Sequence, residues 1–206
     1  MSAKKIVTIS RQYGSGGRYI GRLLAEKLGI PFYDKDILHI AAQESGLSPE
    51  IMEQMEERTA NRYVAMHHIS GDEEGIDATM SYSVPDLVYL AESRAIRRLA
   101  DEGPCVIVGR CGDYILRDRE DVLNVFISAP FPKRIERVVT YYNPELSMAE
   151  AADQIIQIDK RRRRYRRTYT DDKWIRADNY HIAIDSSVIE AEDAVELLSL
   201  FLSKTK

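Results

Sequence analysis

A glycine-rich stretch near the N-terminus has the residue types of an anion-binding loop. Residues 10–18 are Ser-Arg-Gln-Tyr-Gly-Ser-Gly-Gly-Arg. The three glycines would allow backbone N–H groups to turn inward around an anion. We therefore predict that a phosphate is held by the amides of Gly14, Ser15, Gly16, Gly17 and Arg18. The alternative is a plain glycine-rich turn that binds nothing.

The loop departs from the Walker pattern G-x-x-x-x-G-K-[ST], whose lysine and hydroxyl contact the phosphates and the metal. If Arg18 stands for the lysine, Gln12 takes the place of the first glycine and Tyr19 that of the hydroxyl. In the other register, Gly17 holds the lysine position and Arg11 that of the first glycine. In both registers the Ser/Thr that would contact the metal is missing.

Other charged residues follow apolar runs further along the chain. Asp34 and Asp36 come after the run at 30–33, and Arg110 and Asp113 come after the run at 104–108. In open α/β sheets, ligands bind at the carboxyl ends of the strands. Asp34 also suits the N-cap of the following helix, and that role alone would account for it.

A dense run of basic residues occupies positions 160–167. On a helix, Lys160, Arg163, Arg164 and Arg167 would share one face. Like charges this close repel one another, and binding of an anionic partner would reduce this repulsion. The alternatives are a solvated face paired with nearby acids, or a nucleic-acid patch.

These residues need elements that hold them in place. Apolar runs at 6–9, 30–33, 104–108, 122–127 and 181–184 predict five strands. Helical spacing follows most of them, at about 20–28, 37–41, 131–139 and 188–202, with further helices at 85–100 and from a capping box at 147–150 onward. Alternating strands and helices predict a parallel α/β sheet with helices on both faces.

Composition narrows the class of protein. The 206 residues suggest one domain, and 44% hydrophobic residues suffice for a core. The net charge of −4 argues against general affinity for nucleic acid. Cys105 and Cys111 fit reduced thiols of a cytoplasmic protein, and we expect neither a signal peptide nor a membrane span. His67-His68 would point apart on a helix, so no metal site is predicted.

In combination, several of these segments resemble the cytidylate kinase-like family, a branch of the P-loop nucleoside monophosphate kinases. The likeness covers nearly the whole chain. It is carried by the loop at 10–18, Leu-Ala-Glu-Lys-Leu-Gly at 24–29, Phe-Tyr-Asp-Lys-Asp at 32–36, Gly-Arg at 109–110 and the arginine-rich helix.

The resemblance implies a P-loop kinase-type fold built on a five-stranded parallel sheet, with ATP and Mg²⁺ as cofactors and no membrane partner. It implies a single domain over 1–206, with a core of 1–45 and 84–206, a helical acceptor-side insert at about 46–82 and a lid at about 143–170. The insert would close over the acceptor. It also implies that Gly17 replaces the catalytic lysine, and that Cys111 replaces an aspartate for which Asp113 lies close by.

Site roles follow from the same resemblance. The loop residues 14–18 would bind the donor phosphates, and Asp34, Asp36, Arg110 and Asp113 would bind the acceptor, a nucleoside monophosphate such as CMP. Arg18, Arg163, Arg164 and Arg167 would be the catalytic cations. Because the lysine is missing, we expect Arg18→Ala to lower turnover by at least about 100-fold. Two alternatives remain: a nucleotide or anion sensor that has lost transfer, and a nucleic-acid-binding module using the arginine-rich helix.

Overall fold

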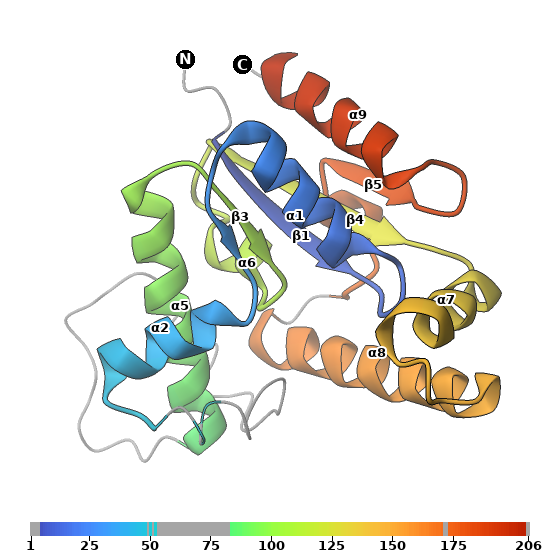
Figure 1. Ribbon diagram of the computed structural model, residues 1–206. Helices are drawn as coiled ribbons and strands as arrows, with labels where there is room; N and C mark the ends of the chain where they lie inside the picture. Colours follow the sequence, from blue (N-terminus) through green and yellow to red (C-terminus); the bar gives the residue numbers. More distant parts are fainter. Residues whose placement is uncertain (1–4, 49, 51, 53–82, 171–172, 205–206) are drawn as a thin grey trace.

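Five short segments form one parallel sheet in the computed structural model, which describes residues 5–48, 50, 52, 83–170 and 173–204 (Figure 1). The strand order is β2-β3-β1-β4-β5. The strands are β1 (Ile6–Arg11), β2 (Phe32–Tyr33), β3 (Cys105–Val108), β4 (Val122–Ser128) and β5 (Ile182–Asp185). The central strands are buried on both faces, which explains why they are continuous apolar runs. The predicted five-stranded parallel sheet is confirmed.

Helices cover both faces of this sheet, as predicted. On one face, α1 (Gly17–Leu28) and α9 (Ala191–Lys204) enclose a core with Val7, Val106 and Leu123. On the other face, α5 (Val84–Glu102) and the short α6 (Gly112–Ile115) enclose a second core. Helix α2 (Asp36–Ser45) packs against α5 and joins this second core.

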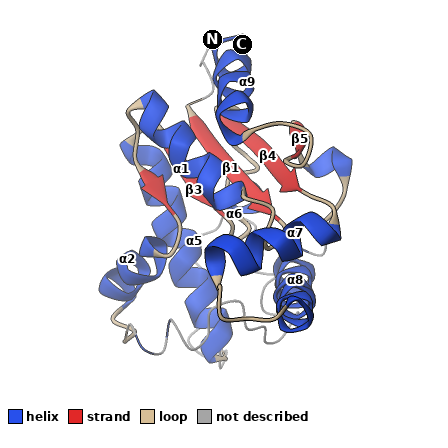
Figure 2. Cartoon of the chain, turned by 45° about the vertical axis from the view of Figure 1, so that its right-hand side comes forward, coloured by secondary structure: helices blue, strands red, loops and turns tan. Residues whose placement is uncertain are grey.

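Two further helices lie at the carboxyl ends of the strands. They are α7 (Phe131–Arg137), which continues as a π-helical turn (Val138–Tyr142), and α8 (Met148–Thr170); a 3₁₀ turn (Ala177–Asn179) follows α8. Figure 2 shows the strand arrowheads directed toward α7 and α8. The predicted capping box at the start of α8 is confirmed, because Glu150 accepts the Ser147 N–H (2.9 Å) and Ser147 Oγ accepts the Glu150 N–H (3.3 Å).

The strand order creates a switch point between β1 and β4, because the chain leaves β1 toward β2 on one side of the sheet and leaves β4 toward β5 on the other. Ligands of open α/β sheets bind at such points, outside the carboxyl ends of the strands. The loop between β1 and α1 lies at this place, with the turn after β3 beside it.

The expected insert at about 46–82 lies largely outside the described residues. The expected lid residues form mainly one continuous helix, α8, of 23 residues. The N-cap interpretation of Asp34 is wrong, because α2 begins at Asp36 after Lys35 and has no side-chain cap hydrogen bond. In the described part of the chain, no helix has the length and apolarity needed to cross a bilayer.

Candidate active site

The glycine-rich loop connects the end of β1 to the start of α1. Gly14 and Gly16 both have φ of 78°, a left-handed conformation that favours glycine. A Cβ at Gly14 would also lie 2.9 Å from the Arg134 carbonyl oxygen, so the loop approaches α7 too closely for a side chain. The amide of Ser15 already donates to the Gln12 carbonyl (3.3 Å). Anion binding by residues 14–18 therefore depends on the other amides and remains a prediction.

Two arginines of α7 hold this loop from one side. Arg137 donates to the Gly14 carbonyl (2.9 Å), and Arg134 donates to the Tyr13 carbonyl (3.2 Å). Arg134 is buried and forms an ion pair with Asp159 of α8 (2.5 Å). The sequence analysis missed both arginines, although their position just after β4 should have suggested that they lie beside the loop.

Helix α8 also contacts the loop, through the side chains of Asp159 and Arg162. Asp159 accepts the Tyr13 N–H (2.9 Å), so one buried carboxylate serves both the loop and Arg134. Arg162 donates to the Arg11 carbonyl (3.2 Å), and its guanidinium lies 5.8 Å from the centre of the Tyr13 ring. The loop is thus fixed by side chains from α7 and α8.

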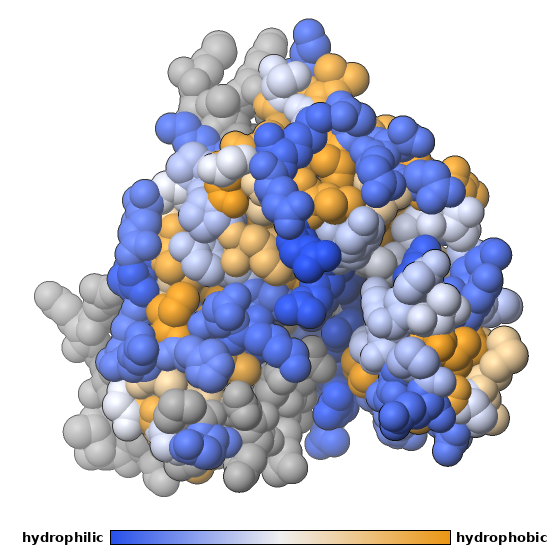
Figure 3. Space-filling model, in the orientation of Figure 1, coloured by the Kyte–Doolittle hydropathy of each residue, from blue (hydrophilic) through white to orange (hydrophobic). Residues whose placement is uncertain are grey.

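A cleft of about 610 Å³ opens over the loop. Its lining combines loop glycines, arginines, one carboxylate and aromatic rings, including Gly14, Gly16, Gly17, Arg11, Arg18, Asp34, Tyr142 and Arg162. Figure 3 shows strongly hydrophilic residues gathered at the centre of this face, with the surface hollowed between them and the part formed by α7 and α8. The cleft is large enough for a nucleotide and carries positive charge.

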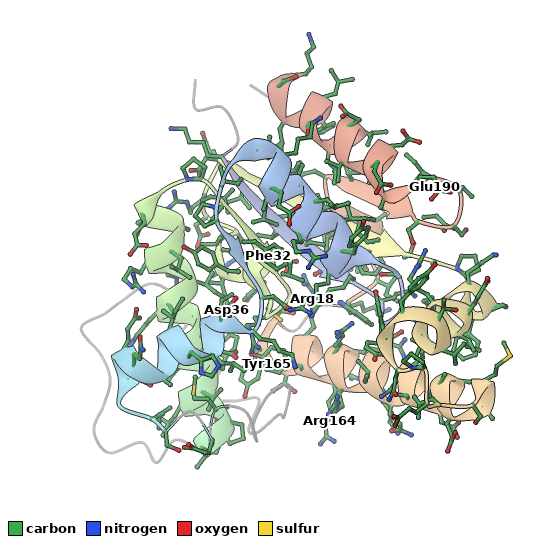
Figure 4. All side chains as sticks on the ribbon, viewed as in Figure 1. Arg18, Phe32, Asp36, Arg164, Tyr165 and Glu190 are labelled. Carbon is green, nitrogen blue, oxygen red and sulfur yellow. The ribbon has the colours of Figure 1, made fainter. Side chains whose placement is uncertain are left out.

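Asp34 is the carboxylate among the residues that line this cleft. It is buried and pairs with Arg18 (2.6 Å), while Arg11 lies 3.8 Å from its other oxygen. The Arg18 side chain is 65% exposed, and it reaches from α1 toward the end of β2 (Figure 4). Asp34 therefore holds two arginines at the cleft instead of capping a helix.

Arg110 lies next to Asp34 in a strained turn. Arg110 and Cys111 have φ of 53° and 54°, an uncommon conformation for residues with side chains. The Arg110 side chain is buried, forms an ion pair with Glu92 of α5 and donates to the Asp34 carbonyl (3.3 Å). Glu92 also accepts the Tyr165 hydroxyl (2.7 Å). Backbone strain of this kind gathers at functional sites, where surrounding contacts stabilise it.

Asp113 and Arg166 form a buried ion pair of 2.6 Å behind this turn. Burial opposes the charge of Arg166, but Asp113 beside it raises the Arg166 pKa above its ordinary value. Arg110 and Arg166 line a second, small cavity of about 30 Å³ together with Trp174. Asp113 is therefore connected to the cavity by its ion pair with Arg166, which is the residue that lines it. Asp36, in contrast, lies in the exposed first turn of α2.

The arginine-rich segment has two faces with different surroundings. Arg163, Arg164 and Arg167 are exposed, whereas Arg166 is buried and Arg162 is half-buried at the cleft. Figure 4 shows Arg164 pointing away from the sheet while the neighbouring Tyr165 points toward it. The structure therefore brings Arg162 to both cavities and Arg166 to the small one, and it leaves the three expected arginines on the outer face.

Basic side chains influence Tyr142 at the cleft. Burial raises the pKa of Tyr142, while Arg137, the backbone of Gly16, Arg162 and Arg18 act to lower it. Arg18 and Arg162 line the cleft together with the loop glycines. Guanidinium groups and backbone amides are hydrogen-bond donors to phosphate oxygens, so the lining residues fit a polyphosphate.

Comparisons with known proteins agree with this geometry. A family model described as the cytidylate kinase-like family matches residues 6–188. No curated protein matches the chain. A crystal structure of an uncharacterized protein from Eubacterium ventriosum ATCC 27560 is similar, with a TM-score of 0.71, 22% identity and coverage of 97% of this chain and 99% of that chain.

Two kinases of known structure share the fold. Shikimate kinase from Bacteroides thetaiotaomicron has a TM-score of 0.55 and 17% identity, with 96% of this chain and 98% of that chain covered. A gluconokinase from Sinorhizobium meliloti 1021 has a TM-score of 0.51 and 16% identity over the whole of both chains. The fold is therefore that of the P-loop kinases. Because the family model spans the loop, the turn at Arg110 and the arginine-rich helix, the chain belongs to the cytidylate kinase-like family.

Proposed function

We propose that the protein is a cytoplasmic kinase that transfers the γ-phosphoryl group of ATP to a small acceptor, a nucleoside monophosphate such as CMP. One observation carries the proposal: a glycine-rich loop at a β1–α1 turn shares a cleft with Asp34, Arg11 and Arg162. Kinase-family membership supports phosphoryl transfer. The choice of CMP rests on the family likeness.

The reaction requires positioning more than acid–base chemistry. An oxygen of the acceptor monophosphate would form a bond to the γ-phosphorus as the bond from that phosphorus to the β–γ bridging oxygen breaks. The electron pair of the broken bond stays on ADP. The attacking oxygen is already an anion, so no base must remove a proton. Charge neutralisation by arginines is then the main contribution of the protein.

Several of the candidate residues have a place in this scheme. The loop amides of residues 14–18 hold the donor phosphates, and Arg110 with Asp34 positions the acceptor. Asp113 contributes by orienting Arg166 toward the second cavity. Asp34 is the carboxylate of the cleft, but both of its oxygens face arginines, so Mg²⁺ would be held by the phosphates of ATP, whose charge it neutralises.

A coupled assay for ADP release tests the proposal. The acceptor panel contains CMP, UMP, AMP and GMP, with shikimate and gluconate included because the kinases of similar fold are named for them. We expect turnover with one monophosphate well above the rate of ATP hydrolysis alone. Turnover with shikimate or gluconate only would contradict the acceptor class.

The sensor alternative is favoured by one observation, the glycine at position 17 in place of a cationic side chain. A sensor would bind ATP without releasing ADP with any acceptor. Calorimetry with ATP together with the same assay panel separates the two functions.

A further inference from the structure

The position of the missing lysine is closed to any side chain. A Cβ at Gly17 would lie 2.7 Å from the Cβ of Arg11 and 3.1 Å from the Cβ of Ile127. The first contact is shorter than real Cβ atoms show, and neither neighbouring atom is the far end of a flexible side chain. Residue 17 is therefore glycine because the side chain of Arg11 fills the adjoining space.

The residue that fills this space is itself the second departure from the Walker pattern. In the register that puts Gly17 on the lysine, Arg11 stands on the first glycine. Relative to the Walker pattern, the long cation and the glycine have thus exchanged positions. The Cβ of Arg11 lies next to the place that a Cβ of residue 17 would occupy. The exchange gives the loop a long cation at the end of β1, in addition to Arg18 at the start of α1.

The guanidinium of Arg11 lies at the centre of the candidate site. A Cβ at Gly109 would lie 2.1 Å from Arg11 Nη1, so the guanidinium covers the turn after β3. Its other end lies 3.8 Å from Asp34, and its side chain is only 15% exposed. Arg11 and Arg162 are the residues that line both the cleft over the loop and the small cavity beside Arg110.

We propose that Arg11 is the cation that replaces the P-loop lysine and contacts the phosphoryl group in transfer. This inference rests on the proposed function. The group in transfer must pass between the donor and acceptor sites, and Arg11 lies where the two cavities adjoin. While the acceptor oxygen bonds to phosphorus and the bridging oxygen leaves, Arg11 N–H groups would hold the non-bridging oxygens.

An exchange of the two residues tests the proposal. Arg11→Gly alone should lower turnover at least about 100-fold, the scale for losing one preorganised electrostatic group. Gly17→Lys alone should also be impaired, because its Cβ meets Arg11. The double variant Arg11→Gly/Gly17→Lys should exceed the better single variant at least about tenfold, because the lysine then enters the space that Arg11 leaves.

Arg161→Ala is the matched control, because it removes an exposed arginine from α8; its turnover should stay within about threefold of wild type. If the Arg11→Gly variant turned over its substrates at the wild-type rate, the proposal would be overturned. A double variant no better than either single variant would overturn the exchange.

A second measurement separates this inference from the proposed function. If the wild type turns over no acceptor, the proposed function fails. The role of Arg11 is then tested by the affinity for ATP, measured by calorimetry. Arg11→Gly should weaken ATP binding by about tenfold or more, whereas Arg161→Ala should not. Equal ATP affinity in wild type and Arg11→Gly would overturn the role of Arg11.

Discussion

At the scale of single residues, pairing with acids decides where several arginines of the site point. Asp34 holds Arg18 at 2.6 Å and has Arg11 at 3.8 Å, while Glu92 holds Arg110 in the strained turn. The guanidinium of Arg18 is largely exposed, and that of Arg11 is largely enclosed. A cation that is enclosed interacts more strongly with phosphate, because less water screens it.

The structure changes the expectation for Arg18→Ala from a loss of at least about 100-fold to a loss of about tenfold or less, well below the effect of Arg11→Gly. The physical reason is that the Arg18 side chain is exposed and directed to Asp34. Steady-state kinetics on both variants gives the comparison. A loss of 100-fold or more in Arg18→Ala would instead favour Arg18 as the cation that replaces the lysine.

At the scale of elements, α8 connects the loop to the core. Its inner face packs Tyr165 and Tyr169 against Tyr89 of α5, with the Tyr89 and Tyr169 rings stacked at 4.0 Å. The same face carries Asp159 to the loop and Arg162 to the cleft. The outer face carries exposed arginines.

The two faces of α8 should differ in their effect on catalysis. We expect Arg162→Ala to lower turnover by about 100-fold, because this arginine lies between the two cavities. Arg164→Ala removes the same charge from the outer face and should change turnover less than about threefold. Equal losses in the two variants would show that the arginine-rich segment acts through general charge and not through the position of Arg162.

Asp159 should be a stability residue of this element. Replacing it with alanine leaves buried Arg134 without its carboxylate and the Tyr13 amide without its acceptor. Loss of one partner of a buried ion pair costs roughly 3 kcal/mol of unfolding free energy. Urea unfolding measures this cost, and Asp153→Ala, an exposed acid on the same helix, serves as the control. A similar, small effect in both variants would contradict the structural role.

At the scale of the whole molecule, the site depends on a sheet whose central strands are covered by helices on both faces. Cys105 begins β3 and is buried, and Cys111 is buried at the turn beyond it; neither is part of a disulfide. Burial raises the pKa of the Cys105 thiol from 9.0 to about 11. The folded protein thus keeps this thiol neutral at pH values where the unfolded chain would ionise it.

The unfolding free energy should consequently decrease as the pH rises through the alkaline range. Below pH 9 the thiol is neutral in both states, so it adds no pH dependence. Between about pH 9 and 11 the unfolded chain loses the proton first, and the unfolding free energy should fall by the order of 1 kcal/mol. Urea unfolding at pH 8 and pH 10.5 measures the change. Cys105→Val should remove this part of the pH dependence, and an unchanged slope in that variant would contradict the assignment.

The order of strands and helices followed from the sequence, because local periodicity and loop chemistry determine it. The glycine-rich loop, the capping box at Ser147 and the parallel sheet were all predicted and are all present. The family likeness was also evident from motifs, and the family model confirms it. The strand, helix and loop segments depend on residues close together in the chain, whereas the pairing of the strands joins distant residues such as Ile6 and Cys105.

Only the tertiary structure decided which side chains face the cleft. The phase of α8 is set by the packing of Tyr165 and Tyr169 on α5, so Arg162 turns inward and Arg164 outward, although both are arginines of one run. The closeness of Arg11 to Gly17 likewise depends on how tightly the loop folds over β1. Such contacts join residues through packing and not through local spacing, and for that reason the sequence pattern pointed to Arg18 while the fold brings Arg11 to the centre of the site.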